Sequence, residues 1–256
     1  MSDVPAQFSI QPNAEVVFKV RYEDEHVIVL DKPAHMVTQP GLGHDDDTLL
    51  NGVFARYGNK LQRLGKARDF GLLHRLDKET SGLLVIALTP EAYDALREAF
   101  ESRSIAKFYY AVVQEPPAKP SGVVRRPIVE HAGEDASGVD RKKMARIGSG
   151  GKPALTAYRV LATSVGGALI ECRPVTGRLH QVRIHLSSIG SPILGDGIYA
   201  KKAIKQAATR LALHAHRLVF THPTTGERVD VHSPMPKDMK NLLSRLRLEL
   251  PPVEAG

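Results

Sequence analysis

The residue with the clearest potential for chemistry is Asp77, an isolated carboxylate in the segment GLLHRLDKETSGLLVIALT, residues 71–89. His74 and Arg75 precede it, a short polar turn follows it, and an apolar stretch at 82–88 comes directly after that turn. A carboxylate on a short loop, fixed at the edge of a rigid strand, is well placed to act as a catalytic group. Taken alone, these residue types favour another interpretation, a strand-entry turn whose Asp binds local amides.

Other sequence patterns that commonly carry chemistry are incomplete. The glycines at 41–43 and 148–153 lack the residues that complete a phosphate-binding loop. No G-x-S-x-G sequence is present, so nothing indicates a serine hydrolase. The acidic run at 45–47 fits a helix start better than a magnesium site. Four histidines of the basic half lack a recognised zinc spacing and fit phosphate, base or structural hydrogen bonds better: His180, His185, His214 and His216.

Charge is unevenly distributed along the 256 residues, which carry 35 basic and 28 acidic side chains and a net charge of +7. Residues 1–60 contain 5 basic and 9 acidic side chains, whereas residues 141–217 contain 14 basic side chains and only two acidic ones, Glu171 and Asp196. A concentrated positive segment suits a phosphate-contacting surface, because each neutralised phosphate releases condensed counterions. The alternative is a solvated surface whose lysines favour solubility.

The composition excludes several classes of protein. Hydrophobic residues make up 42% and charged residues 25% of the chain, as in a globular protein and unlike a disordered acidic tail or a collagen. The one cysteine, Cys172, excludes a disulfide scaffold and a zinc finger. No apolar run reaches the roughly 18 residues of a membrane span, and the first residues lack signal-peptide features. We therefore expect a cytoplasmic protein with no membrane partner.

The elements that must position these residues follow from apolar patterns. Strands are predicted at 16–20, 27–30, 82–88, 109–113, 156–161, 169–172, 218–220 and 229–231. Helices are predicted from Asp47 or Thr48 through Tyr57, from Thr89 and Pro90 through Phe100, and at 239–246. The stretch 115–153, rich in Pro, Gly and charge, predicts long loops or an insertion. Since strands outnumber helices without strict alternation, the pattern favours an α+β fold.

The segment HRLDKETSGLLVIAL resembles the signature H-R-L-D-x-x-T-S-G of the RluA-type pseudouridine synthase family, which an apolar strand follows. Other segments resemble further motifs of that family and occur in the same order. They are VIVLDKPAHMVTQPG at 27–41, KFYYA at 107–111, PVTGRLHQVRIHLSSIGSPILGDGIYA at 174–200 and RLALHAHRLVFTHPTTGE at 210–227. Several ordered matches are more specific than one, so the capping interpretation of Asp77 no longer leads.

For the fold, the resemblance implies the pseudouridine synthase fold, a mixed, largely antiparallel central sheet flanked by helices and loops. The expected organisation is an N-terminal extension at 1–20, a single catalytic domain at 21–250 with a loop-rich insertion near 115–153, and a tail at 251–256. We expect no N-terminal RNA-binding module of the kind that many relatives carry, because only about 20 residues precede the first motif. Substrate selection then falls to the basic face and loops of the catalytic domain.

For the activity, the resemblance implies an isomerase that acts on uridine in structured ribosomal or transfer RNA. Such an enzyme flips the base out, detaches uracil from its ribose, turns it and rejoins it through carbon 5, without a cofactor or a metal. Asp77 matches the essential aspartate. The sequence leaves open whether this carboxylate attacks the anomeric carbon or assists loss of the neighbouring proton, both of which carboxylates can do.

The resemblance also assigns other site residues. Arg183 matches the arginine that pairs with the aspartate, and Tyr109 the tyrosine that stacks on uracil near carbon 5. Their alternatives are a surface phosphate contact for Arg183 and a core strand position for Tyr109. Tyr110 lies on the opposite strand face and takes the role if the motif register differs by one. Further expected RNA-binding residues are Arg75, which fills the gap left by the flipped base, and His74, Lys107, Arg178, His180, Gln181 and His214.

The sequence departs from the family pattern at three positions. His35 stands where the first motif has Gly, Gln39 occupies a later histidine position, and Ser191 replaces a histidine before P-I-L-G-D. None of these changes affects Asp77, Tyr109 or Arg183. The departures therefore put in question only the RNA contacts around the pocket. A second hypothesis is an RNA-binding or RNA-chaperone protein with a vestigial site. For either activity we expect a monomer.

Overall fold

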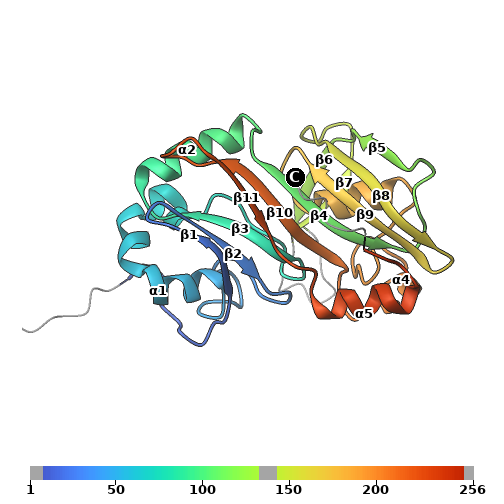
Figure 1. Cartoon of the computed structure of the whole chain (residues 1–256), viewed down its shortest axis with the longest axis horizontal. Coiled ribbons are helices and arrows are strands. Elements are labelled where there is room, and N and C mark those ends of the chain that lie inside the picture. Colours follow the sequence, from blue (N-terminus) through green and yellow to red (C-terminus); the bar gives the residue numbers. More distant parts are fainter. Residues whose placement is uncertain (1–7, 133–142, 251–256) are drawn as a thin grey trace, which may run out of the picture. The chain divides into compact units, whose positions relative to one another are not determined.

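The chain contains two compact units, which the computed structural model describes over residues 8–132 and 143–250 (Figure 1). The first unit contains residues up to Ile105 together with Arg217–Ser233. The second contains Ala106–His216 and the residues from Pro234 onward. Each unit is therefore assembled from two separate stretches of the chain.

Antiparallel strands form the framework of the first unit. β1 (Lys19–Glu23) pairs with β2 (Val27–Lys32), and β2 pairs with β3 (Ser81–Ala87). A tight turn joins β1 to β2, where the Asp24 carboxylate accepts the backbone N–H groups of His26 and Val27, both at 2.8 Å. Every residue of β3 is buried, which explains its continuous apolar sequence. β10 (Leu213–Thr221), whose residues are divided between the two units, pairs antiparallel with β11 (Arg228–His232).

Helices of the first unit form where the sequence supplies caps and amphipathic spacing. α1 (Leu49–Leu64) begins after the N-cap Thr48 and buries Leu50, Val53, Phe54 and Leu61. α2 (Pro90–Glu101) begins with Thr89, whose hydroxyl accepts the Ala92 N–H, and with a proline in the first turn. The short helix η1 (Lys66–Gly71) leads into the segment that carries Asp77.

One glycine is essential where that segment begins. Gly71 has a φ of 86°, and a Cβ built there would lie 2.2 Å from the carbonyl oxygen of Ala87. A side chain at this position would therefore clash with the last residue of β3, in addition to straining the backbone. Gly71 allows the chain to pass close against the end of the strand before it turns into the Asp77 loop.

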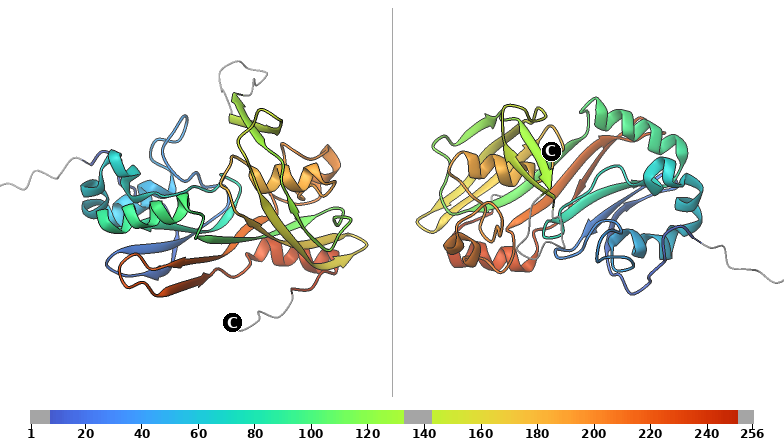
Figure 2. Two further views of the ribbon diagram at one scale, coloured as in Figure 1. Left: turned by 90° about the horizontal axis from the view of Figure 1, so that it is seen from above. Right: turned by 180° about the vertical axis from the view of Figure 1, so that it is seen from behind.

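The second unit contains a larger antiparallel arrangement. The strand order is β4 (Ala106–Val113), β9 (Gly167–Pro174), β8 (Thr156–Ser164) and β5 (Ser121–Val124). Two further strands, β6 (Ile128–Ala132) and β7 (Lys143–Ile147), form a separate sheet. The helices are α3 (Gln181–Ser188), α4 (Lys202–Gln206) and α5 (Lys237–Leu246). Ile128, Ala145, Ala154 and Ile184 form a small core between α3 and the β6–β7 sheet. Figure 2 shows α3 beside these strands.

The expected α+β class, with a largely antiparallel sheet flanked by helices, is confirmed. The stretch 115–153, predicted to form long loops or an insertion, contains β5, β6 and β7, although residues 133–142 lie outside the described part of the chain. The expected domain boundaries at residues 20 and 250 stay predictions, and the tail 251–256 also lies outside the described residues.

The helices in the described part of the chain are all too short or too polar to span a bilayer.

Candidate active site

Asp77 lies in the first unit, on the short loop between η1 and β3, and is partly buried. The backbone N–H of Thr80 donates to the carbonyl oxygen of Asp77 at 3.1 Å, which closes a turn, and β3 begins at the next residue, Ser81. Because the whole of β3 is buried between neighbouring elements, the loop is anchored at a rigid point. The structure therefore places the carboxylate at the head of a fixed strand, as the sequence predicts.

Thr38 holds the residue that precedes the carboxylate. Its hydroxyl donates to the carbonyl oxygen of Leu76 at 2.8 Å and accepts the Leu76 N–H at 3.3 Å. Thr38 is itself fixed to α1, because its carbonyl oxygen accepts the Leu50 N–H at 3.0 Å. Both Thr38 and Leu76 are buried, so these hydrogen bonds are protected from water. Sequence analysis did not identify Thr38, although it lies within the first motif segment, 27–41.

Lys32 holds the residue that follows the carboxylate. Its side chain is fully buried, and Nζ donates to the carbonyl oxygens of Pro33 and Met36 at 2.8 Å and of Lys78 at 3.3 Å. A buried ammonium group is costly unless its donors are satisfied, and carbonyl dipoles satisfy them here. Lys32 thereby ties the loop after β2 to the turn that carries Asp77.

His74 and Arg75, the other predicted site residues of this loop, are placed differently from each other. His74 Nε2 accepts the Val85 N–H at 3.2 Å, and its ring lies 5.0 Å from that of Phe100. His74 thus helps to fix the loop to β3. The Arg75 side chain is exposed to solvent. Their expected RNA-binding roles stay predictions.

In the second unit, Tyr109 and Tyr110 are adjacent on β4 and point to opposite faces of the sheet. Tyr109 is buried at 9% exposure and lies opposite Cys172 on β9. Tyr110 stacks on the His216 ring, with the ring centroids 3.6 Å apart and an interplanar angle of 8°. The two tyrosines are therefore not interchangeable, because each faces different surroundings.

Arg183 forms a buried ion pair on α3. Its Nε and Nη2 atoms each donate to one oxygen of Asp196, both at 2.8 Å, and the two side chains are 3% and 1% exposed. Asp196 also accepts the backbone N–H groups of Ile198 and Tyr199, at 2.8 and 3.0 Å. Burial by itself raises the pKa of Asp196, but the Arg183 guanidinium and the two amides outweigh it and lower that pKa. The carboxylate is therefore ionised at neutral pH.

Asp196 and Tyr199 are site residues that sequence analysis left without a role. The Arg183 guanidinium lies 5.2 Å from the centroid of the Tyr199 ring, and the Tyr199 hydroxyl is 2.7 Å from His180 Nδ1. The sequence did contain a signal for Asp196, which is one of only two acidic residues at 141–217. A lone buried acid in a basic segment needs a cationic partner.

Gln181 uses its amide inside the protein. Its Oε1 accepts the Thr176 hydroxyl at 2.6 Å and the Arg178 N–H at 3.1 Å. Its Nε2 donates to the Leu155 carbonyl at 2.9 Å and to the Thr156 hydroxyl at 3.0 Å. The side chain therefore holds the turn before α3 against the start of β8, a positioning role that the sequence did not suggest. Its expected RNA contact stays a prediction.

Three other predicted RNA-binding residues also lie in the second unit. Burial lowers the pKa of Lys107 to about 8. The Lys107 amino group lies close to Gly177, since a Cβ built on that glycine would be 3.8 Å from Nζ. Arg178 donates through Nε to the carbonyl oxygen of Pro153 at 3.3 Å, and His214 is fully buried on β10. Lys107 and Arg178 thus both lie at the turn that precedes α3. RNA contact by any of the three stays a prediction.

The predicted site residues are thus gathered in two places. His74, Arg75 and Asp77 share one loop of the first unit. The second unit holds the others on β4, on β10 and around the start of α3, and these are Lys107, Tyr109, Arg178, His180, Gln181, Arg183 and His214. The expected pairing of Asp77 with Arg183 joins residues of different units and stays a prediction.

Comparison with known proteins gives consistent results. The family described as RNA pseudouridylate synthase matches residues 26–188. The ribosomal large subunit pseudouridine synthase D of Zymomonas mobilis is 41% identical over 91% of this chain and 74% of its own. The protein of the same name from Neisseria meningitidis serogroup A is 41% identical over 89% of this chain and 61% of its own. The chain thus spans 61% to 74% of the length of these two relatives.

Solved structures agree with the sequence relatives. Human RNA pseudouridylate synthase domain containing 4 is 28% identical, with a TM-score of 0.67 over 91% of this chain and 94% of its own. Human RNA pseudouridylate synthase domain containing 1 is 25% identical, with a TM-score of 0.66 over 93% of this chain and 98% of its own. The arrangement of helices and strands described above is therefore shared with solved proteins of one family.

Proposed function

Because the chain belongs to the RNA pseudouridylate synthase family, and so to a class of isomerases, we propose that it converts uridine to pseudouridine in large-subunit ribosomal RNA. Two observations support the choice of RNA. Bacterial relatives that are about two-fifths identical are named for the ribosomal large subunit, which favours ribosomal over transfer RNA. The concentration of basic side chains at 141–217 suits a large polyanion.

The RNA gains and loses no atoms overall in this reaction. The bond between uracil N1 and ribose C1′ breaks, the ring turns, and a bond forms between C5 and C1′. C5 loses a proton and N1 gains one, so substrate and product are isomers. The protein must then supply a group that assists cleavage, a surface that holds the detached ring, and a route for one proton.

Asp77 is our candidate for the group that assists cleavage. A carboxylate can attack C1′ to form a sugar ester, or accept a neighbouring ribose proton, and either role requires the ionised form. The observation that carries this proposal is the support of the Asp77 loop on both sides. Thr38 holds Leu76 and Lys32 holds Lys78, so the loop is built to present one side chain in a fixed position.

Arg183 is our candidate for the partner of that carboxylate. A guanidinium carries five N–H donors, and Asp196 accepts hydrogen bonds from Nε and Nη2 of Arg183. A guanidinium whose plane is fixed by one carboxylate presents its other N–H groups in a fixed direction, which suits contact with a second carboxylate. Such a pair would hold the Asp77 carboxylate in one orientation.

Tyr109 and Arg75 are our candidates for contacts with the RNA. The Tyr109 ring offers an apolar face for the uracil, and its hydroxyl can relay the proton between C5 and N1. Arg75 is exposed and carries a planar group that can stack in the space left by a flipped base, which offsets part of the unstacking cost. Base flipping is part of this proposal, because the neighbouring stacked bases block access to C1′ and leave the uracil no room to turn.

The proposal is tested with Asp77→Asn on a large-subunit ribosomal RNA fragment, with pseudouridine mapped by its chemical adduct. We expect the wild type to give a signal, the variant to give none, and RNA affinity to stay within a few-fold. Asp46→Asn, which changes an exposed carboxylate of the same unit, serves as the matched control and should keep full activity. A wild type that modifies no uridine would refute the proposal.

The basic segment motivates a second candidate function, an RNA-binding protein whose isomerase site is vestigial. It predicts that Asp77→Asn retains both RNA affinity and the biological role of the protein. A strain that carries this variant in place of the wild-type protein separates the two hypotheses. The cytoplasmic location and the monomeric state also stay predictions.

A further inference from the structure

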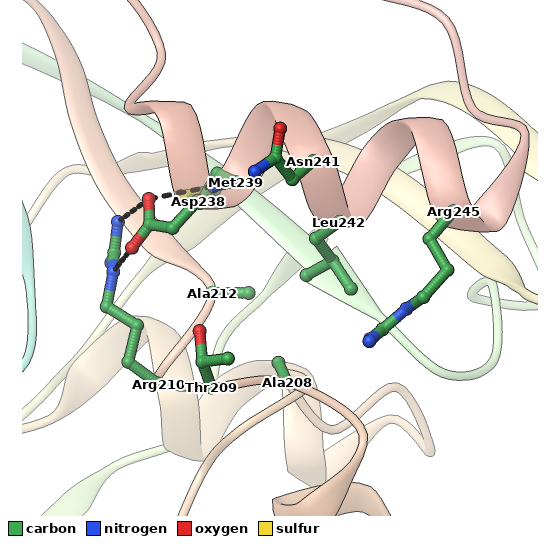
Figure 3. Close-up of a pocket in the computed structure, with 9 residues that line it drawn as sticks. All are labelled: Ala208, Thr209, Arg210, Ala212, Asp238, Met239, Asn241, Leu242 and Arg245. Atoms are coloured by element: carbon green, nitrogen blue, oxygen red, sulfur yellow. Dashed lines mark hydrogen bonds and ion pairs between the residues drawn. The ribbon is translucent and has the colours of Figure 1, made fainter.

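A cavity of about 240 Å³ lies in the second unit, between α5 and the segment that leads from α4 into β10 (Figure 3). None of its lining residues belongs to the proposed active site. They are Ala208, Thr209, Arg210, Ala212, Asp238, Met239, Asn241, Leu242 and Arg245. The cavity therefore needs an explanation of its own.

One end of the cavity is closed by a rigid ion pair. Arg210 donates through Nε and Nη2 to the two oxygens of Asp238, at 2.5 and 3.1 Å, and through Nη1 to the Leu211 carbonyl at 2.9 Å. The Arg210 side chain is 4% exposed. Burial raises the pKa of Asp238, but the Arg210 guanidinium outweighs it and lowers that pKa. This end is thus polar but nearly neutral in net charge.

The opposite end carries a positive charge, for which residues 8–132 and 143–250 supply no carboxylate partner. Arg245 lies on the last turn of α5 and donates to the carbonyl oxygen of Ala207, a neutral acceptor. Figure 3 shows the Arg245 guanidinium facing the Arg210–Asp238 pair across the cavity, with the apolar side chains of Leu242 and Ala212 between them. The cavity thus combines an apolar wall with a cationic end.

Exposed lysines, called here the lysine rim, lie on α5, which lines the cavity, and on α4, which precedes its other wall. Lys201, at the start of α4, and Lys202 and Lys205 within it are exposed, as are Lys237 and Lys240 on α5. Within residues 8–132 and 143–250, none of these five lysines forms an ion pair with a carboxylate. A surface with so many unneutralised cations favours a polyanionic partner.

We propose that this cavity and its lysine rim form a second RNA-binding site, in which the cavity receives the base of one unpaired nucleotide. The phosphates on either side of that nucleotide contact Arg245 and the α4 lysines. The proposal rests on the proposed function for the identity of the polyanion. The second site would bind the RNA at α5, through residues other than those assigned to the reaction.

Size and chemistry select this ligand. A volume of about 240 Å³ is below the roughly 300 Å³ at which sites for drug-sized ligands begin, so the cavity suits a group as large as one nucleobase. Unpaired bases bind through their faces to apolar or aromatic side chains and through their edges to polar groups. Leu242 and Ala212 supply the face, and the Thr209 hydroxyl supplies a hydrogen-bonding group.

The first test measures the affinity of a large-subunit ribosomal RNA fragment in the Asp77→Asn background, where no turnover interferes. Thr209→Trp places a large ring in the cavity and should weaken binding about tenfold, as expected when one buried base is lost. Thr209→Ser keeps the hydroxyl and the space and should bind as the parent does. Thermal unfolding verifies that both variants are folded. Equal affinities for Trp and Ser variants would overturn the proposal.

The second test concerns the rim and uses variants that cannot disturb the core. Lys202→Glu should reduce the slope of log Kd against log salt by about one, because one phosphate contact is lost. Lys119→Glu is the matched control, since Lys119 is also exposed and in the second unit, and it should leave the slope unchanged. An unchanged slope for Lys202→Glu would count against the rim.

The third test identifies the source of the nucleotide. RNA that contains 4-thiouridine should crosslink to the peptides carrying Thr209 or Leu242, and Thr209→Trp should abolish these crosslinks. Free uridine monophosphate at millimolar concentration should not saturate the cavity in NMR titrations. Saturation by the free nucleotide without RNA crosslinks would overturn the RNA assignment. All three tests measure binding, so a wild type that binds here but forms no pseudouridine would refute only the proposed function.

Discussion

Arg183 and Asp196 are joined by two parallel hydrogen bonds of 2.8 Å in a part of the second unit from which water is almost excluded. This bidentate geometry fixes the plane of the guanidinium as well as its position. Single hydrogen bonds would leave the side chain free to rotate. Asp196 therefore fixes the orientation of the whole Arg183 guanidinium, on which the proposed role of Arg183 depends.

Removing the Asp196 carboxylate should be strongly destabilising. Asp196→Ala leaves the Arg183 charge buried without its partner, and such losses cost about 3–5 kcal/mol in the free energy of unfolding. Urea denaturation monitored by circular dichroism measures this cost. Glu101→Gln disrupts the exposed Arg97–Glu101 pair and serves as the control, with no change expected beyond experimental error. A cost for Asp196→Ala as small as that of the control would contradict the buried pair.

The contribution of this pair should depend on pH in one direction. The pKa of Asp196 is lowered from its ordinary value of 3.8 in the folded protein, so the pair contributes fully above about pH 4 and is lost as the pH falls through the folded-state pKa. We expect the stability difference between wild type and Asp196→Asn to be constant from pH 7 to pH 5. It should shrink below pH 4 in urea denaturation series, and a difference that persists undiminished at pH 2 would contradict the assignment.

Thr38→Val should impair turnover more than substrate binding. Valine has nearly the shape of threonine, but it leaves the Leu76 carbonyl and N–H without the hydroxyl that both now contact. Leaving such buried groups unsatisfied costs about 1–3 kcal/mol. We expect kcat to fall severalfold with little change in KM, because the Asp77 loop loses one of its two supports. Thr38→Ser restores the hydroxyl and should recover most of the activity; if it does not, the hydroxyl is not what positions the loop.

Replacement of the two tyrosines should have separate effects, because they occupy opposite faces of β4. Tyr109→Phe keeps the ring and removes the hydroxyl, so we expect slower turnover on bound RNA. Tyr109→Leu removes the stacking surface as well and should reduce kcat further. Tyr110→Leu removes the stack on His216 and should lower the melting temperature while kcat stays near that of the wild type. The opposite assignment of the two effects would mean that Tyr110 serves the reaction.

Much of the framework could be predicted where one physical signal dominates. β3 is a continuous apolar run because all seven of its residues are buried, and α2 begins with a Thr-Pro pair that both caps the helix and sets its first turn. Alternation along β4 correctly separates Tyr109 from Tyr110. The position of Asp77 before β3 follows from the same apolar run.

The rest depended on contacts that sequence patterns do not encode. α3 was not predicted, because Gln181, Arg183 and His185 are buried on it and interrupt the apolar spacing of an ordinary amphipathic helix. Each is retained by partners from other elements, such as the Thr156 hydroxyl and Arg126 carbonyl that contact His185. The strands β5 to β7 are only four or five residues long and lie in a stretch rich in Pro, Gly and charge, so composition favoured loops.

The division of β10 between the two units has a consequence for synthesis of the protein. The unit that carries Asp77 includes Arg217–Ser233, so it lacks the β10–β11 hairpin until that stretch has left the ribosome. By then almost the whole of the other unit has been translated. A nascent chain of 150 residues would therefore contain all of the unit that carries Asp77 except Arg217–Ser233. The N-terminal 105 residues expressed alone would leave β3 without its neighbouring strand β10, and we expect such a fragment to require chaperones.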